Sequence, residues 1–364
     1  MRMKLALAAA LVLSVAHTSF AKDIYGLEPG PLELKSATTM TFGPSGILFV
    51  GDAQAATIYA IQTGDTKGDA ANAKYNIENL SKKVAEALNA DNAQITDLAV
   101  NPASGHLFLG VQTGQKAAIV KIENGNMISP VDLGNIAHSK ATLPNAAEDK
   151  EVGEGRRRRN NRGSSITDLA FVDGELIVSG LANDDTPTNV WSLVFPFQSV
   201  DKGTSLEIYH AAHGRSESYP AIQTFIPFMI DGEAHVLAGF TCTPLVKFPV
   251  SKLTGKAAEQ LEGTTVAELG NRNRPLDMIS YEKDGSNYLL LANSARGVMK
   301  IGTDKLSEVS LSEPVRGGGQ AGQDYVTIES MDGVVQLDKL NDTHAVLITQ
   351  AEGGPAHLKT VELP

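Results

Sequence analysis

The sequence predicts an all-β fold in which similar sheets repeat around one axis. Residues 95–122 show a strand, a turn, a second strand, a Gly-containing loop and a third strand, and the pattern recurs at 38–61 and 166–195. Apolar and polar residues alternate along these segments, and turn-forming residues separate them, as expected for short half-buried strands. Including looser copies, the units are 38–61, 95–122, 166–195, 221–250, 276–301 and 326–363.

This repeat pattern resembles the β-propeller superfamily, specifically the loosely patterned secreted propellers of the NHL, YVTN and gluconolactonase or strictosidine-synthase-like types. The resemblance covers about residues 36–364 and is architectural. Trp191 is the only tryptophan and no unit carries a GH…WD signature, which disfavours the WD40 type. We expect six or seven blades, because the termini or the insertions have room for one more. The strand-like LEL at 32–34 is expected to close the ring by completing the blade that the C-terminal HLKTVEL begins.

Residues 1–21 have the pattern of a bacterial signal peptide. Arg2 and Lys4 precede the apolar run LALAAALVLSVA, and Ser19 and Ala21 occupy the small-residue positions of a cleavage site. We therefore expect residues 22–364 to form a single propeller domain that is periplasmic or secreted. No later apolar run reaches the roughly 18 residues of a membrane span. The net charge of −11 argues against a nucleic-acid partner, and the lone Cys242 cannot form an internal disulfide.

Two insertions interrupt the repeats. Residues 76–88 place Ile77, Leu80, Val84 and Leu88 on one helical face, which predicts a helix that covers the edge of a blade. The polar stretch at about 140–164 contains an acidic run followed by arginines from Arg156 to Arg162, without apolar periodicity. It is predicted to be a disordered insertion. It serves either as a solvated loop with partly neutralised charges, or as a basic patch or protease-sensitive segment.

The repeats also predict a ring of polar residues along the channel. Aligning the first strand of each unit, which is innermost in a propeller, makes the following residues equivalent: Thr39, Asp97, Asp168 and, in looser register, Gln223, Asp277 and Thr327. Three carboxylates in a narrow channel repel one another, and cations, hydrogen-bond donors or water would stabilise them. Three interpretations remain open: clasps to backbone amides of the adjoining blade, a calcium site formed by Asp97, Asp168 and Asp277, or a catalytic role. Similarity to gluconolactonase-like propellers implies a channel cation and cation-assisted hydrolysis, although the first inner strand lacks the Glu that this family uses as a ligand.

A second set of candidate residues lies on loops predicted to surround the channel mouth. The candidate ligand-binding residues are Asp52, Tyr219, Cys242, Arg274, Asn293 and Arg296. Cys242 together with His210 and His213 of the HAAH segment is a further candidate metal or nucleophile site, although neither a C-x-x-C nor an H-E-x-x-H motif supports it.

These observations favour an exported propeller that binds a small ligand, an ion or a partner protein at the channel mouth, with no evident catalysis. The alternative is a divalent-cation-dependent hydrolase or lyase of the gluconolactonase-like kind, with calcium as the expected cofactor. The catalytic alternative requires at least two of Asp97, Asp168 and Asp277 to hold a cation with an open coordination position. The binding alternative predicts that these carboxylates contact backbone amides.

Overall fold

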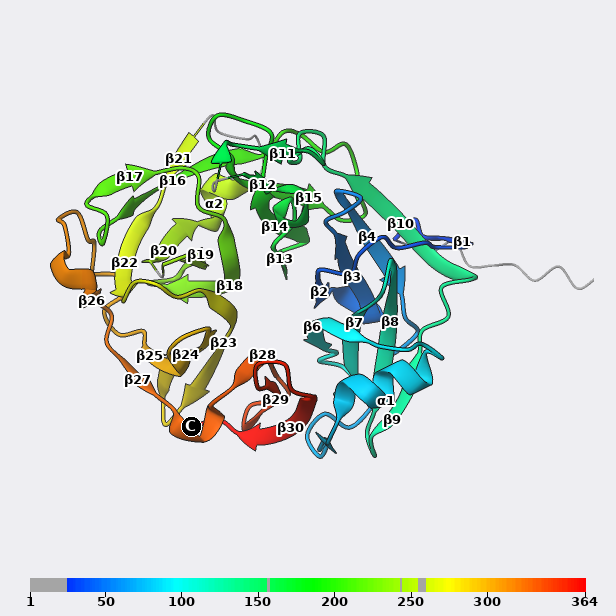
Figure 1. Cartoon of the computed structure of the whole chain (residues 1–364). Helices are drawn as coiled ribbons and strands as arrows, with labels where there is room; N and C mark the ends of the chain where they lie inside the picture. The colour runs from blue at the N-terminus through cyan, green and yellow to red at the C-terminus, as the bar shows by residue number, and fades with distance from the viewer. Residues whose placement is uncertain (1–24, 156–157, 243, 255–259) are drawn as a thin grey trace, which may run out of the picture.

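Six sheets radiate from a common axis in the computed structural model, which describes residues 25–155, 158–242, 244–254 and 260–364. One strand of each sheet lies nearest the centre, and the other strands of that sheet follow progressively farther out (Figure 1). The molecule is therefore a six-bladed β-propeller, which confirms the predicted fold class and decides between six and seven blades. The predicted signal peptide lies outside the described residues. None of the described helices has the length and apolar character needed to cross a bilayer.

We number the blades by the order of their innermost strands along the chain. Blade 1 contains β2 (Thr39–Phe42), β3 (Ile47–Asp52), β4 (Thr57–Gln62), β10 (Ile136–Thr142) and β1 (Glu28–Gly30). Blade 2 contains β6 (Gln94–Val100), β7 (Leu107–Thr113), β8 (Lys116–Glu123) and β9 (Met127–Pro130). Blade 3 contains β13 (Asp168–Val172), β14 (Glu175–Leu181), β15 (Thr188–Val194), β16 (Thr204–His210) and β17 (Arg215–Glu217), with β21 (Gln260–Glu262) parallel to β16.

The remaining blades follow the same plan. Blade 4 contains β18 (Ile222–Ile230), β19 (Glu233–Phe240), β20 (Pro244–Pro249), β22 (Thr264–Leu269) and β26 (Gln320–Gly322). Blade 5 contains β23 (Pro275–Lys283), β24 (Ser286–Asn293), β25 (Gly297–Gly302) and β27 (Tyr325–Thr327). Blade 6 contains β28 (Val334–Lys339), β29 (His344–Gln350), β30 (Ala356–Glu362) and β5 (Asn76–Ile77). The helices are α1 (Leu80–Ala87) and α2 (Val250–Leu253), with short 3-10 helices η1 (Pro44–Gly46), η3 (Arg162–Ser164), η4 (Arg316–Gly318) and η5 (Glu329–Met331).

The order of the blades around the ring differs from their order in the chain. The inner strand of blade 2 packs against those of blades 1 and 6, and the inner strand of blade 1 also packs against that of blade 3. The ring order is therefore 1, 3, 4, 5, 6, 2 (Figure 1). After β4 the chain reaches the outer edge of blade 6 as β5, builds blade 2, and returns to blade 1 as β10.

The predicted closure of the ring is wrong in its choice of strand. The C-terminal strand β30 pairs with β5, in the register Leu358↔Ile77, while β1 pairs with β10 of blade 1. Leu32 and Leu34 are buried between blades 1 and 2 and so lie away from blade 6. The predicted edge helix is confirmed, since α1 packs on β30 and β9.

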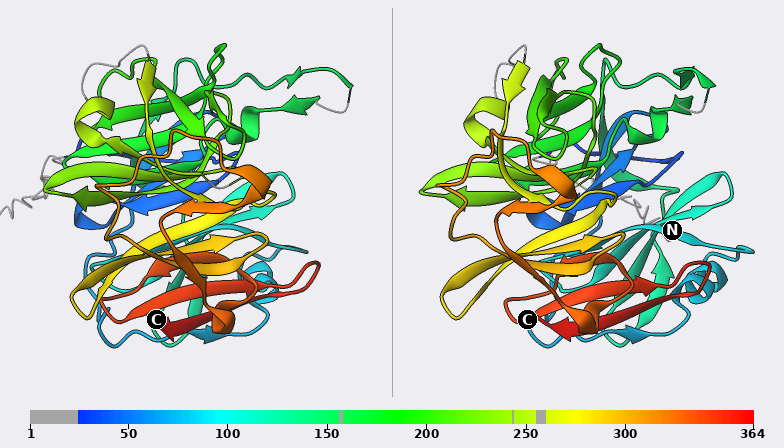
Figure 2. Two further views of the ribbon diagram at one scale, coloured as in Figure 1. Left: turned by 90° about the vertical axis from the view of Figure 1, so that its left-hand side faces the viewer. Right: turned by 60° about the vertical axis from the view of Figure 1, so that its left-hand side comes forward.

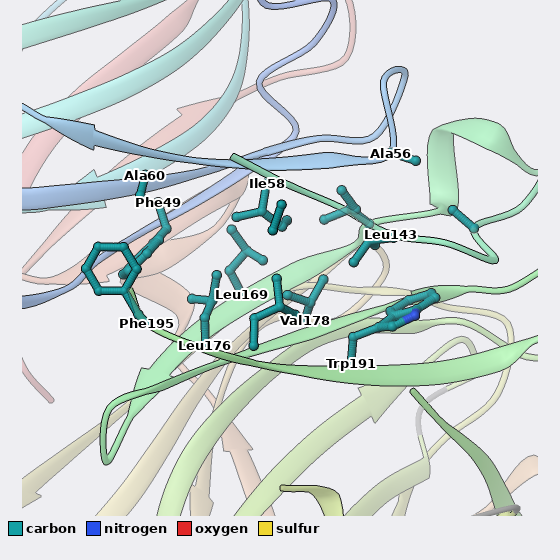
Figure 3. Close-up of a cluster of buried hydrophobic side chains, with 14 of the residues drawn as sticks. Phe49, Ala56, Ile58, Ala60, Leu143, Leu169, Leu176, Val178, Trp191 and Phe195 are labelled. Atoms are coloured by element: carbon teal, nitrogen blue, oxygen red, sulfur yellow. The ribbon is translucent and has the colours of Figure 1, made fainter. Parts of the chain in front are cut away.

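Each junction between neighbouring blades has its own hydrophobic core, and the strand alternation explains why. In β3, Ile47 and Phe49 pack towards blade 3, whereas Leu48 and Val50 pack towards blade 2. A strand that is buried on both faces can therefore serve two cores. Figure 3 shows the core between blades 1 and 3, where Phe49, Ile58, Leu176 and Trp191 are labelled. These six cores hold the inner strands around the channel.

The polar insertion at about 140–164, predicted to be disordered, carries ordered elements in its described part. Strands β11 (Glu151–Val152) and β12 (Arg159–Asn160) form a hairpin that projects from the disc (Figure 2). Arg162 anchors its base, because its guanidinium donates to the carbonyls of Gln54 and Ala147, both at 3.0 Å. Arg162 thus connects the insertion to the loop that follows β3. Arg156 and Arg157 lie outside the described residues.

Candidate functional site

One position on each inner strand faces the channel, and a bulge sets its register. Strand pairing makes six residues of the inner strands equivalent: Thr39, Asp97, Asp168, Thr224, Asp277 and Gln336. Their partners on the second strands are, in the same order, Gly51, Gly110, Ser179, Gly239, Ala292 and Ile348. In blades 2, 4, 5 and 6 a register shift comes immediately before this position.

Four of the six residues assigned to this ring from the sequence are therefore correct. The prediction for blade 4 is off by one residue. The bulge adds a residue to the strand, so Thr224 and not Gln223 occupies the ring position. Thr327 is wrong because it belongs to β27, the outer strand of blade 5, and Gln336 of β28 occupies its place.

The three ring aspartates, and Asp338 two residues after Gln336 on β28, accept hydrogen bonds from backbone amides of a neighbouring blade. The four cross-blade bonds are Met40 N to Asp97 Oδ2 (2.6 Å), Phe225 N to Asp168 Oδ2 (2.7 Å), Leu337 N to Asp277 Oδ2 (2.9 Å) and Val100 N to Asp338 Oδ2 (2.7 Å). A fifth contact, from the Thr39 hydroxyl to Asp168 Oδ1 (3.3 Å), joins blades 1 and 3. The predicted backbone clasps of Asp97, Asp168 and Asp277 are confirmed, because each of these carboxylates ties its blade to a neighbour.

Asp338 and Gln336 were missed in the sequence. Both lie on β28 in the segment VVQLDK, which has the alternation of an inner strand, but unit six was begun too early in the chain. In the amide orientation that satisfies its surroundings, Gln336 donates to Asp97 Oδ1 and Asp277 Oδ2, both at 3.1 Å. Gln336 therefore bridges two carboxylates that repel each other.

The ring carries more negative charge than its surroundings favour. Burial raises the pKa of Asp168 to about 6 and that of Asp338 to about 6, although backbone amides oppose the shift. Burial raises the pKa of Asp97 and of Asp277 still further, and the nearby carboxylates add to the effect. Ionisation of these carboxylates is therefore less favourable than that of an exposed aspartate, and a cation in the channel would offset this effect.

A cavity of about 400 Å³ lies inside the ring. Its wall runs from the ring aspartates to Pro102, Ser280 and Lys339, which follow the ring position along the inner strands. The cavity thus lies towards the hairpins that join first and second strands. Lys339 is the one basic residue among the described residues that line it, and its ammonium pairs with Asp342 at 2.9 Å.

None of the six loop residues predicted to bind a ligand lines the cavity. Four gather around a buried Asn273, which was not predicted. Asn293 donates to the Asn273 side chain (2.9 Å), the Cys242 amide donates to its carbonyl (3.0 Å), the Arg274 amide donates to Ser294 Oγ (2.9 Å), and Arg296 donates to the Asn271 carbonyl (3.2 Å).

The other two loop candidates lie elsewhere. Asp52 is buried on blade 1 and accepts the amides of Lys35 (2.7 Å) and Ser36 (3.0 Å), so it fixes the entry to β2. Tyr219 donates to Glu217 (2.7 Å) at the outer edge of blade 3. The predicted Cys–His grouping also differs from the structure: within the described residues, Glu217 rather than Cys242 joins His210 and His213 in a possible metal-binding group.

No family model and no curated protein matches the sequence. Among solved structures, the chain is similar to the PQQ-bound aldose sugar dehydrogenase of Streptomyces coelicolor, with 11% identity, coverage of 92% of this chain and 96% of that one, and a TM-score of 0.31. It is similar to the periplasmic gluconolactonase of Pseudomonas aeruginosa, with 12% identity, coverage of 90% and 85%, and a TM-score of 0.33. It is also similar to the extracellular region of plexin A4, with 7% identity, coverage of 92% and 47%, and a TM-score of 0.42.

Proposed function

We propose that this protein is an exported binding propeller whose channel cavity takes a small cation, with calcium as the ion to test first. The observation that carries the proposal is that the three ring aspartates, together with Asp338, line one cavity that has a single basic residue on its described wall. A cation inside the ring would offset the burial and the repulsion between carboxylates that raise the pKa of Asp97 and Asp277.

The spacing of the carboxylates favours a cation that keeps part of its water shell. Among the described residues, the ring does not bring ligand atoms of three acidic side chains within 4.8 Å of one another. Each carboxylate already accepts backbone amides, which leaves it fewer free lone pairs. Calcium accepts water among its oxygen ligands and tolerates irregular geometry, so it suits such a site better than zinc.

The test is a calorimetric titration of metal-stripped residues 22–364 with CaCl2, MgCl2 and tetramethylammonium chloride. We expect saturable binding of one calcium ion and release of protons, because ionisation of the ring carboxylates accompanies binding. Titration in two buffers of different ionisation enthalpy measures the proton release. The double variant Asp97→Asn with Asp277→Asn should weaken binding at least about tenfold, which corresponds to about 1.4 kcal/mol.

Asp52→Asn is the matched control, because Asp52 is also a buried, amide-bound aspartate but lies outside the cavity wall. The Asp52→Asn protein should bind calcium as the wild type does, even if the substitution lowers its stability. The proposal fails if the wild type binds none of the three cations, or if the double variant binds calcium as tightly as the wild type.

One observation favours the hydrolase or lyase alternative. Asp168 and Asp338, each with a pKa of about 6, face a cavity, and general acid–base catalysis works best with groups that titrate near the working pH. Calcium-dependent turnover of a sugar lactone that is lost in Asp168→Asn would support this alternative. Calcium binding without turnover would support the binding function and contradict the hydrolase or lyase alternative.

A further inference from the structure

The hairpin formed by β16 and β17 brings three metal-ligating side chains together at the outer edge of blade 3. His210 pairs with Arg215 and Ile208 pairs with Glu217, so a tight turn places His213 beside both strands. Ligand atoms of His210, His213 and Glu217 all lie within 4.8 Å of one another. Nδ1 of His210 is 2.9 Å from Glu217 Oε2, and Nδ1 of His213 is 2.8 Å from Glu217 Oε1.

These three side chains are held firmly but are still reached by solvent. The side chains of His210 and Glu217 are each 1% exposed, whereas that of His213 is 40% exposed. The Tyr219 hydroxyl and Arg215 Nε donate to Glu217 Oε1 at 2.7 and 2.9 Å, which fixes the carboxylate. The two imidazole rings lie 3.7 Å apart between their centroids. An ion could therefore enter from the His213 side and find two ligands already oriented.

Two buried polar atoms beside the hairpin lack a hydrogen-bond partner within the described residues. They are Nε2 of His210 and Oε2 of Glu268. Glu268 lies on β22 of blade 4, and its other oxygen accepts the amide of Ala212, which lies between the two histidines in the chain (3.1 Å). Unpaired buried polar atoms are costly, so the unpaired Glu268 oxygen beside a histidine pair points to a ligand.

We propose that His210, His213 and Glu217 bind a divalent transition-metal ion of the zinc class, with the Glu268 carboxylate supplying nearby compensating charge. Two imidazoles and a carboxylate are ligands that zinc accepts and that calcium does not prefer. Three protein ligands leave a fourth position, which the exposed side of His213 opens to water. Bound metal would cross-link the hairpin and hold the outer edge of blade 3.

A positive charge lies beside the proposed ligands. Arg215 is the opposing charge, and its side chain, 64% exposed, is free to turn into solvent.

The test is titration of metal-free residues 22–364 with ZnCl2, and with CoCl2 as a spectroscopic probe. We expect one zinc ion per chain, an increase in melting temperature, and cobalt absorption typical of a low-coordinate nitrogen and oxygen site. His213→Ala should weaken zinc binding at least about tenfold, or about 1.4 kcal/mol. Because His213 is exposed, this change leaves the core intact, and His213→Gln serves as a second variant. His344→Ala, outside the cluster, is the matched control and should bind zinc as the wild type does.

Arg215→Gln separates a metal site from a purely structural ion-pair cluster. Removing the competing cation should tighten zinc binding several-fold, whereas a structural cluster would only lose stability. Unchanged zinc affinity in both His213 variants, or no zinc binding by the wild type, would overturn the proposal. The Asp97→Asn, Asp277→Asn protein should keep zinc binding, so this test and that of the channel cation succeed or fail independently.

Discussion

At the residue scale, the inner aspartates combine two roles that usually conflict. Each carboxylate accepts an amide of the neighbouring blade, which favours the ionised form. Burial in the enclosed channel favours the protonated form, and nearby carboxylates add to this effect at Asp97, Asp277 and Asp338. Because the pKa values are raised, burial and repulsion outweigh the effect of the amide hydrogen bonds. Ionisation of these aspartates as pH rises therefore lowers the stability of the folded protein.

This balance predicts an unusual pH dependence. The folded pKa of Asp338, about 6, lies above its ordinary value of 3.8, so the folded state holds the proton more tightly. Its contribution to stability is complete below the ordinary value and is lost as pH rises through about 6. Asp338→Asn removes this titration, and we expect the decrease in unfolding free energy between about pH 5 and about pH 7.5 to shrink by roughly 1 kcal/mol. Urea unfolding at the two pH values measures it.

The control is Asp91→Asn, which changes an exposed aspartate and should keep the wild-type difference between the two pH values. An Asp338→Asn protein with the same pH dependence as the wild type would show that Asp338 does not titrate in this range. A metal-free sample is needed, because a bound cation would keep the ring ionised.

At the element scale, the second strands combine two buried faces with a glycine that allows close approach. Gly51, Gly110 and Gly239 pair with three of the channel-facing residues. A Cβ at Gly110 would lie 2.7 Å from the Ala37 carbonyl oxygen and 2.8 Å from Thr96 Oγ1. The Thr96 hydroxyl donates to the same carbonyl, which joins the bulge of blade 2 to the entry of blade 1.

Gly110→Ala should therefore destabilise the protein by about 1–3 kcal/mol, because the clash involves backbone that cannot turn aside. Gly30→Ala is the matched control in a strand of blade 1. Its nearest atom would be His138 Cε1 at 3.7 Å, an ordinary contact. Chemical denaturation of both variants compares them, and equal stability would contradict the close approach of blades 1 and 2.

At the scale of the whole molecule, ring closure depends on a short strand from an insertion. β5 pairs with β30, and Ile77, which is 1% exposed, packs in the core between blades 2 and 6. The amide of Tyr75 also donates to Thr360 Oγ1 at 2.9 Å. The last blade is thus completed by residues that precede blade 2, which ties early and late parts of the chain.

Ile77→Ala should lower the unfolding free energy by about 2–5 kcal/mol, since it leaves a cavity where the ring closes. Guanidinium unfolding followed by circular dichroism measures the change, and the transition midpoint should move to lower denaturant. Asn76→Ala, at the exposed neighbouring position of the same strand, is the control and should have little effect. A midpoint that Ile77→Ala leaves unchanged would mean that β5 does not contribute to closure.

Sequence-based prediction succeeded for features set by neighbouring residues and failed for features set by strand register and strand pairing. Asp97, Asp168 and Asp277 were placed at the channel because each sits in a strand with strong alternation, followed by a turn. Thr224 was missed through a bulge of one residue, and Gln336 and Asp338 through the wrong start of the last unit. Glu217 was missed because its partnership with two histidines depends on the pairing of β16 with β17.

The sequence by itself determined the all-β repeat, the inward polar position and the edge helix, since periodicity and turn residues act over a few neighbours in the chain. Only the tertiary structure decided the order of the blades, the closing strand, the side of the ring on which the cavity lies and the grouping of His210 with Glu217. Those features depend on contacts between segments far apart in the chain. The alternation of apolar and polar residues predicts which face of a strand is buried, but it does not predict which blade covers that face.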